Sequence, residues 1–164
     1  GLDRDNNMRK DTSLEKLAKL KPAFDNEHGT LTAGNSTPFT DGASCILLAS
    51  EEWAKDHGLP VLAYITYAEV AAIEYVKQRQ NLLLAPVFAA TRMLKKAELN
   101  LQDFDFYEIH EAFSAQVLAT LKIWESAELM RSFGFDKALG SIDRSKLNVN
   151  GSSLAAAHPF AATG

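Results

Sequence analysis

Cysteine is almost absent from this sequence, which holds one, Cys45, among its 164 residues. A single cysteine excludes an intramolecular disulfide and is typical of a reduced, intracellular protein. Uninterrupted apolar runs long enough to span a bilayer are also missing, and the first residues lack the basic-then-apolar pattern of a signal peptide. We therefore expect a soluble protein with no membrane association.

Basic clusters are missing as well. The 17 lysines and arginines are outnumbered by 21 acidic residues, which gives a formal net charge of -4. Without a basic run, a broad nucleic-acid footprint is not expected, and neither standard glycine pattern of a phosphate-binding loop is present. What the chain does have is 46% apolar residues, enough for a domain with a sizeable core.

Short apolar runs alternate with segments whose apolar residues recur at helical spacing. Runs of the first kind predict strands, and segments of the second kind predict helices. The expected strands are 42–49, 61–67, 104–109 and 147–150, and the expected helices are 13–20, 50–57, 86–96, 111–124 and 126–133. This alternation predicts a layered α/β architecture with a central sheet.

Two histidines stand out as candidate site residues. His158 precedes Pro159 in a run of glycine, alanine and serine at 148–164, and His110 lies where a predicted strand meets a predicted helix. Imidazole is suited to moving protons near neutral pH, and turns that leave strands gather at one edge of a sheet. Both histidines can therefore face one site. The structural alternatives are a histidine satisfied by backbone carbonyls for His158 and a helix-entry cap for His110.

Other reactive side chains favour structural interpretations. Adjacent His110 and Glu111 point in different directions at a helix start and lack a third ligand at metal-site spacing, so we expect no metal and interpret Glu111 as a first-turn carboxylate. Cys45 lies in an apolar strand without a basic neighbour, the setting of an inert buried thiol. Asn148 and Asn150 can bind a substrate or close a turn. Four phenylalanines can line a pocket, although the core is the default for each: Phe24, Phe39, Phe113 and Phe160.

Five motifs, in the same order and at about the same spacing, resemble the thiolase family over nearly the whole chain. They are Lys19-Leu-Lys-Pro-Ala-Phe24, Gly29-Thr-Leu-Thr-Ala-Gly-Asn-Ser-Thr37, Asp41-Gly-Ala43, His110-Glu-Ala-Phe113, and Asn148-Val-Asn-Gly151 through His158-Pro-Phe-Ala-Ala-Thr-Gly164. The His-Glu-Ala-Phe form resembles the fatty-acid-oxidation branch, which includes the trifunctional-enzyme β subunit, and argues against a ketoacyl synthase.

The resemblance implies an αβαβα layered fold and an enzyme that exchanges acyl groups between coenzyme A and a catalytic cysteine. It would cleave 3-ketoacyl-CoA thiolytically or run the reverse Claisen condensation, with coenzyme A as a substrate and no permanently bound cofactor. By resemblance, His158 helps to activate the cysteine and contributes to an oxyanion hole, in which His110 holds a water. Donors aimed at developing negative charge are worth about 3 kcal/mol each.

The resemblance also assigns binding residues and partners. Residues that contact coenzyme A or line the pantetheine and acyl path are Phe24, Ala33, Thr37, Ala112 and Phe113, and supporting residues are Glu111, Asn150 and Gly151. A homodimer or tetramer is implied, with a hydratase/dehydrogenase subunit as a further partner. The implied location is the cytoplasm for a bacterial protein and the mitochondrion for a eukaryotic one.

The resemblance divides the chain into three parts: 1–39 as the end of the loop domain that covers coenzyme A, 40–58 as the closing strand and helix of the N-terminal half, and 59–164 as a truncated C-terminal half. Both catalytic cysteines are expected outside this sequence, since Cys45 does not match either. We therefore expect the fragment alone to be inactive, with the strand at 42–49 lacking sheet partners and exposing an apolar edge.

Two departures from the family motif lie beside His158. The family's Gly-His-Pro reads Ala157-His-Pro, and its Gly-Gly reads Gly151-Ser152. A Cβ added at a tight catalytic turn can displace the histidine or weaken the site. The alternative function is therefore a noncatalytic relative that binds coenzyme A or another subunit.

Overall fold

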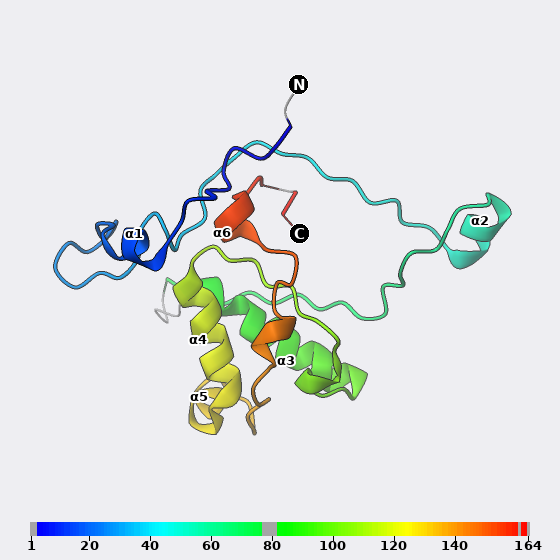
Figure 1. Cartoon of the computed structure of the whole chain (residues 1–164). Coiled ribbons are helices and arrows are strands. Elements are labelled where there is room, and N and C mark those ends of the chain that lie inside the picture. Colours follow the sequence, from blue (N-terminus) through cyan, green and yellow to red (C-terminus); the bar gives the residue numbers. More distant parts are fainter. Residues whose placement is uncertain (1–2, 77–81, 161, 164) are drawn as a thin grey trace.

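Helices and loops account for the part of the chain that the computed structural model describes, residues 3–76, 82–160 and 162–163 (Figure 1). The α-helices are α1 (Leu14–Ala18), α2 (Glu51–Asp56), α3 (Ala85–Ala97), α4 (Ser114–Glu125), α5 (Ala127–Ser132) and α6 (Ser153–Ala156). The 3-10 helices are η1 (Leu82–Leu84), η2 (Leu101–Asp103) and η3 (Arg144–Lys146).

Serine caps begin three of the helices that the sequence predicts. The hydroxyl oxygens of Ser13, Ser50 and Ser126 accept hydrogen bonds from the backbone N–H groups of residues in the first turns of α1, α2 and α5. Such caps satisfy N–H groups that have no partner inside the helix. Pro86 occupies the start of α3, where its missing N–H costs nothing. These four helices confirm the sequence predictions to within a few residues.

The helix expected at 111–124 begins later, at Ser114. The preceding residues are held extended by backbone hydrogen bonds to the segment 35–37: Thr37 N–H donates to the Ala112 carbonyl at 3.0 Å, and Ser114 N–H donates to the Asn35 carbonyl at 3.0 Å. These bonds compete with a helical turn. The prediction of a helix-entry cap at His110 and a first-turn carboxylate at Glu111 is therefore wrong.

One hydrophobic core lies between α3, α4 and α5. Its buried members are Leu84, Val87, Leu94, Leu101, Val117, Leu121, Ile123, Trp124, Met130 and Ile142. Val87 and Met130 are completely inaccessible to solvent. Figure 1 shows the three helices packed together as a body, which we call the helical body, with α6 beside it.

The four expected strands do not form ladders among the described residues. Extended pairing occurs only as single bridges there: Ser36 with Phe113, Phe39 with His158, and Tyr107 with Leu147. The segments 104–109 and 147–150 do meet, because Tyr107 N–H donates to the Lys146 carbonyl at 2.8 Å and Asn148 N–H donates to the Tyr107 carbonyl at 2.8 Å. A strand needs a neighbour along its length, and the described residues supply one only at these points.

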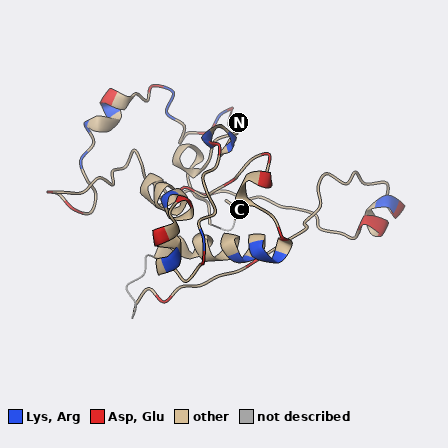
Figure 2. Ribbon diagram, turned by 90° about the horizontal axis from the view of Figure 1, so that it is seen from below, with Lys and Arg blue, Asp and Glu red and all other residues tan. Residues whose placement is uncertain are grey.

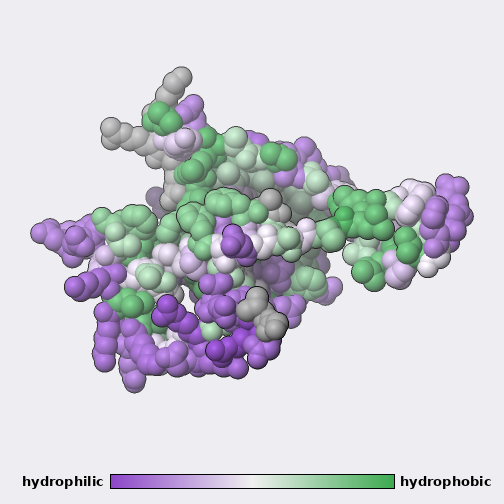
Figure 3. Space-filling model, turned by 90° about the horizontal axis from the view of Figure 1, so that it is seen from above, coloured by the Kyte–Doolittle hydropathy of each residue, from purple (hydrophilic) through white to green (hydrophobic). Residues whose placement is uncertain are grey.

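The segment 41–76, which we call the arm, extends away from the helical body and carries α2 (Figure 1). Its apolar side chains face solvent: Leu62 is 91% exposed, Ile46 78% and Ile65 74%. Figure 3 shows this apolar surface along the projecting arm. The exposed apolar edge expected at 42–49 is present, whereas the expected burial of Cys45 is wrong, because the thiol lies on this uncovered segment.

Basic and acidic residues are interspersed along the described parts of the ribbon (Figure 2). Among the residues that the structure describes, no helix is long and apolar enough to cross a bilayer. The same residues contain no group of three or more histidine, cysteine, aspartate and glutamate side chains placed to hold a metal ion.

Candidate active site

The imidazole rings of His110 and His158 lie against each other, with centroids 4.2 Å apart and ring planes inclined by 31°. His110 lies in the extended segment before α4, and His158 follows α6. The backbone positions the second ring, because His158 N–H donates to the Pro38 carbonyl at 2.9 Å and the residue pairs with Phe39. Segments far apart in the sequence thus bring the two predicted histidines together.

Asn148 joins the two histidine segments. Its side-chain oxygen accepts from Ile109 N–H at 2.8 Å, and its amide nitrogen donates to the Ile109 carbonyl at 3.0 Å and to the Glu111 carboxylate at 2.9 Å. Its backbone is left-handed, with φ of 49°, a conformation that asparagine tolerates well. The turn itself is closed by the backbone, because Gly151 N–H donates to the Asn148 carbonyl at 2.8 Å.

Glu111 carries the connection onward to α6. Its second carboxylate oxygen accepts from the backbone N–H of Leu154 at 3.2 Å, while its own N–H donates to the Ser153 hydroxyl at 3.0 Å. A carboxylate at the N-terminal end of a helix is favoured because unpaired N–H groups are exposed there. Glu111 therefore fastens its own segment to the start of α6, whereas the prediction made it a first-turn carboxylate of the helix after His110.

Two hydroxyl groups that the sequence reasoning missed contact the histidines. Ser153 Oγ lies 2.6 Å from His110 Nδ1, and Thr163 Oγ1 lies 2.6 Å from His158 Nδ1. Ser153 is almost completely buried, with 3% of its surface exposed. The sequence did contain one signal. Most residues around His158 are glycines and alanines, and Ser153 and Thr163 have side chains that can form hydrogen bonds.

The position of His110 lowers its pKa. Partial removal of the ring from water disfavours the charged form, and the adjacent His158 adds repulsion, while Glu111 acts weakly in the opposite direction. His110 is therefore held in its neutral form near neutral pH. A neutral imidazole has one nitrogen that donates and one that accepts.

Two aromatic rings, those of Phe39 and Phe160, lie against the His158 ring. Phe160 lies 4.6 Å from the His158 ring centroid and stacks on Phe39 at 5.2 Å, while Phe24 meets Phe113 edge-on at 6.1 Å. Phe24, Phe39 and Phe160 are 70–75% exposed, so the core default for them is wrong. These side chains remain accessible to solvent, because the loops that hold them run over the surface.

The residue before His158 has an unusual backbone. Ala157 is 3% exposed and has φ of 73° and ψ of -172°. Only glycine adopts this region readily, and a residue with a Cβ is strained there by about 1–3 kcal/mol. The concern raised by the sequence at Ala157 therefore corresponds to a measurable distortion beside the candidate site. Gly151, with φ of 84°, occupies a left-handed position that suits its residue type.

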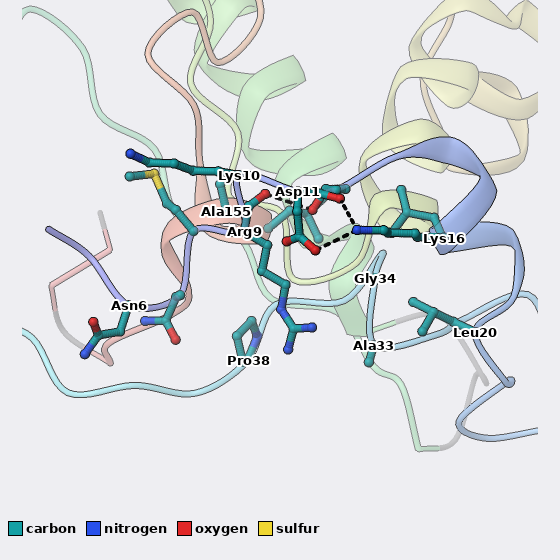
Figure 4. Close-up of a pocket in the computed structure, with 15 residues that line it drawn as sticks. Asn6, Arg9, Lys10, Asp11, Lys16, Leu20, Ala33, Gly34, Pro38 and Ala155 are labelled. Carbon is teal, nitrogen blue, oxygen red and sulfur yellow. Dashed lines mark hydrogen bonds and ion pairs between the residues drawn. The ribbon is translucent and has the colours of Figure 1, made fainter.

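A pocket of about 790 Å³ opens beside α6 and α1 (Figure 4). Its lining includes the cationic side chains of Arg9, Lys10 and Lys16, the carboxylate of Asp11, and small and aliphatic residues such as Ala33 and Leu154. Leu154 directly follows Ser153. The pocket and the histidine pair therefore share α6 as a common wall.

Thr37, Ala112 and Asn150 are the other predicted site residues with defined surroundings. The Thr37 hydroxyl donates to the Ser153 carbonyl at 2.6 Å, and Ala112 accepts the Thr37 N–H, so both fasten segment 35–39 beside the rings. Asn150 is exposed in the turn after segment 147–148. The geometry thus gathers Thr37, Ala112 and Glu111 around the histidines and leaves Asn150 apart.

Two family models match the sequence, one described as "Thiolase, C-terminal domain" over residues 59–164 and one as "Thiolase, N-terminal domain" over residues 1–52. The chain belongs to the thiolase family. The 3-ketoacyl-CoA thiolase of Shewanella loihica is 48% identical over 164 aligned residues, which cover 99% of this chain and 37% of that protein. This thiolase chain therefore spans little more than a third of the length of the curated relatives it matches.

Solved thiolase structures have the same arrangement of the backbone. Human mitochondrial 3-ketoacyl-CoA thiolase in complex with CoA superposes with a TM-score of 0.76 at 36% identity, covering 99% of this chain and 36% of that one. The dimeric peroxisomal thiolase of Saccharomyces cerevisiae gives 0.74 at 32% identity, covering 98% and 36%. These matches confirm the thiolase-like α/β fold class, of which this chain contributes helices and loops.

Proposed function

We propose that this thiolase chain contributes an acid-base and oxyanion-binding wall to an enzyme that transfers acyl groups to and from coenzyme A. The reaction is thiolytic cleavage of a 3-ketoacyl-CoA to acetyl-CoA and a shortened acyl-CoA, or the reverse Claisen condensation. The observation that carries the proposal is the contact between the His110 and His158 rings. One imidazole able to accept a proton beside one able to donate a hydrogen bond suits chemistry that passes through an oxyanion.

The pocket beside α6 supports coenzyme A as the ligand. Its volume of about 790 Å³ lies in the range of small-molecule sites. Arg9 and Lys10 offer positive charge to phosphate groups, and Lys16 is already paired with Asp11 at 2.6 Å. Ala33 and Leu154 offer an apolar surface to a pantetheine chain. In this arrangement the thioester end extends past α6 toward the histidines, with Phe24 and Phe113 beside its path.

Oligomer, partner and location follow from the relatives as proposals. The yeast relative is described as dimeric, which supports a homodimer, and a tetramer is the alternative. A hydratase/dehydrogenase subunit is proposed because the His-Glu-Ala-Phe motif resembles the branch that works with one. The Shewanella relatives support the cytoplasm, and the human relative supports the mitochondrion for a eukaryotic source.

The family models at 1–52 and 59–164 support a division between N-terminal and C-terminal halves near residue 58.

A hybrid enzyme tests the activity. Residues 1–164 replace the matching segment of the S. loihica thiolase, and loss of acetoacetyl-CoA is followed in the presence of coenzyme A. We expect turnover, and we expect His158→Ala to lower kcat by about a hundredfold or more, because the proton acceptor is lost. His28→Ala is the matched control, since that imidazole is 84% exposed in a loop away from the pair, and it leaves kcat unchanged.

The strained Ala157 favours one second candidate, a thiolase relative that binds coenzyme A without catalysis. A folded hybrid that binds coenzyme A in calorimetry but has no turnover supports this candidate and overturns the first. A folded hybrid with neither binding nor turnover overturns both. Full turnover in His158→Ala contradicts the role assigned to that histidine.

A further inference from the structure

Each histidine of the pair has its Nδ1 atom against a hydroxyl group from the same short stretch of chain. Ser153 lies on His110, and Thr163 lies on His158, each at 2.6 Å. A hydroxyl has one hydrogen to donate and two lone pairs to accept with. What else each hydroxyl contacts therefore decides which ring nitrogen carries the proton.

Thr163 gives its hydrogen to a carbonyl. Its Oγ1 donates to the Pro159 carbonyl oxygen at 3.2 Å, and that oxygen can only accept. With its hydrogen engaged, Thr163 can only accept from His158, so both contacts form together only when His158 Nδ1 carries a proton. In the neutral ring, Nε2 then holds the free lone pair.

Ser153 is oriented in the opposite sense. Its oxygen already accepts a hydrogen bond from Glu111 N–H at 3.0 Å, which turns its hydrogen toward His110 Nδ1 at 2.6 Å. The neighbouring Ser152 oxygen lies at 3.4 Å and competes only weakly for that hydrogen. Nδ1 of His110 is therefore an acceptor, and its Nε2 carries the proton.

We propose that Ser153 and Thr163 are positioning residues that hold the two neighbouring imidazoles in opposite tautomers, with His158 Nε2 as the proton acceptor and His110 Nε2–H as the hydrogen-bond donor. The inference rests on the proposed function for its catalytic meaning. A thiol nucleophile loses its S–H proton to His158 Nε2, and an N–H bond forms as the S–H bond breaks. His110 Nε2–H donates a hydrogen bond to the thioester oxygen as negative charge develops there.

The two hydroxyls also have opposite effects on protonation of the rings they contact. His158 keeps its bond to Thr163 when Nε2 gains a proton, because Nδ1–H donates in both states. His110 cannot gain a proton without turning the Ser153 hydroxyl away, since two hydrogens would face each other. Burial and the adjacent His158 lower the pKa of His110 in the same direction. Protonation at Nε2 therefore preserves the hydroxyl contact of His158, whereas protonation at Nδ1 would break the hydroxyl contact of His110.

Nuclear magnetic resonance of the ring nitrogens tests the tautomers without any substitution. In the ¹⁵N-labelled full chain, long-range ¹H–¹⁵N correlations above the pKa of each ring report which nitrogen is protonated. We expect Nδ1–H on His158 and Nε2–H on His110. The same tautomer in both rings, or the reverse assignment, overturns the inference. The result does not depend on turnover. An inactive hybrid therefore contradicts the proposed function, whereas a different tautomer contradicts only this inference.

The direction in which Ser153→Ala changes the pKa of His110 also tests the inference. A hydroxyl that donates to the ring stabilises the neutral form, so its removal raises the pKa. A hydroxyl that accepts from the ring stabilises the charged form, so its removal lowers the pKa and contradicts the inference. The titratable groups facing His110 are His158 and Glu111, which this variant keeps. Ser152→Ala is the control and leaves the pKa of His110 unchanged.

Thr163→Val tests the second hydroxyl in the hybrid enzyme. Valine keeps the shape and removes the acceptor, so we expect kcat to fall about tenfold, the effect of one lost orienting hydrogen bond. Thr163→Ser restores both the rate and the Nδ1–H tautomer. If Thr163→Val lowers kcat while His158 keeps its Nδ1–H signal, the effect is purely structural and the positioning role is overturned.

Discussion

The helical body and the arm have similar apolar content and opposite burial. In the body, α3, α4 and α5 bury apolar side chains such as Val87, Leu121 and Met130 against one another. The arm instead exposes Ile46, Leu62 and Ile65. Helices satisfy their backbone hydrogen bonds internally and can pack at once. Extended segments need neighbouring strands, so their side chains are buried only when a sheet is assembled around them. The difference indicates that the core of the body is packed without side chains of the arm, whereas the arm touches the histidine segment at Ser44, whose hydroxyl donates to the Ala162 carbonyl at 3.2 Å.

The largest effect on the free energy of unfolding is expected from a substitution in the helical body rather than in the arm. Leu121→Ala removes a side chain that is 3% exposed, and we expect the free energy of unfolding to fall by about 2–5 kcal/mol. Leu62→Ala removes one that is 91% exposed and should change it by less than about 0.5 kcal/mol. Urea denaturation followed by circular dichroism measures both. Equal losses would show that the arm is packed in solution.

A smaller effect is expected at the edge of the histidine site. Ala157→Gly relieves a backbone strain of about 1–3 kcal/mol, and the extra freedom of glycine in the unfolded chain offsets part of the gain. We expect the variant to be about 1 kcal/mol more stable by urea denaturation. Ala156→Gly, in the last turn of α6, is the matched control and should lose stability. A loss at Ala157 as well would mean that the turn relaxes in solution.

The smallest effect concerns the attachment of the arm to the body. Lys96 of α3 forms an ion pair with Glu69, and this hydrogen bond lowers the pKa of the Glu69 carboxyl. Because the folded pKa lies below the unfolded one, the stabilisation is present above the unfolded pKa and is lost as pH falls through the folded pKa. Glu69→Gln should therefore be slightly less stable than wild type near neutral pH and equal to it in acid.

A double-mutant cycle with Lys96→Met isolates the pair, and added salt should reduce the coupling. A coupling that is zero at low ionic strength would show that the arm does not rest on α3 through these residues.

Prediction from sequence succeeded where the determinants are local. The helices at 13–20, 50–57, 86–96 and 126–133 were predicted because their signals, such as the serines that cap three of them, lie within one turn. It failed at 110–113, where bonds to residues 35–37 override the helical pattern, and at 42–49 and 61–67, where apolar runs stay unpaired. Five motifs in order were enough to identify the thiolase family, although no single motif was.

The candidate site divides in the same way. Its two histidines were visible because imidazole in a small-residue run or at a strand end is a recognisable pattern. Ser153 and Thr163 were not distinguished from their neighbours, because a serine or threonine has the same local appearance whether it faces solvent or a ring. Ala157 was identified by comparison with the family motif, and its φ of 73° gave that difference a physical meaning.

The amino-acid sequence by itself determined helices α1, α2, α3 and α5 and the family, since each depends on short-range propensity or on the order of motifs. Only the tertiary structure decided that His110 and His158 are in contact, that Asn148 and Glu111 fasten their segments, and which hydroxyl faces which ring. Those contacts join residues 35–39, 107–113 and 148–163 through long-range hydrogen bonds. Their geometry is set by the packing of these segments together and by no one of them alone.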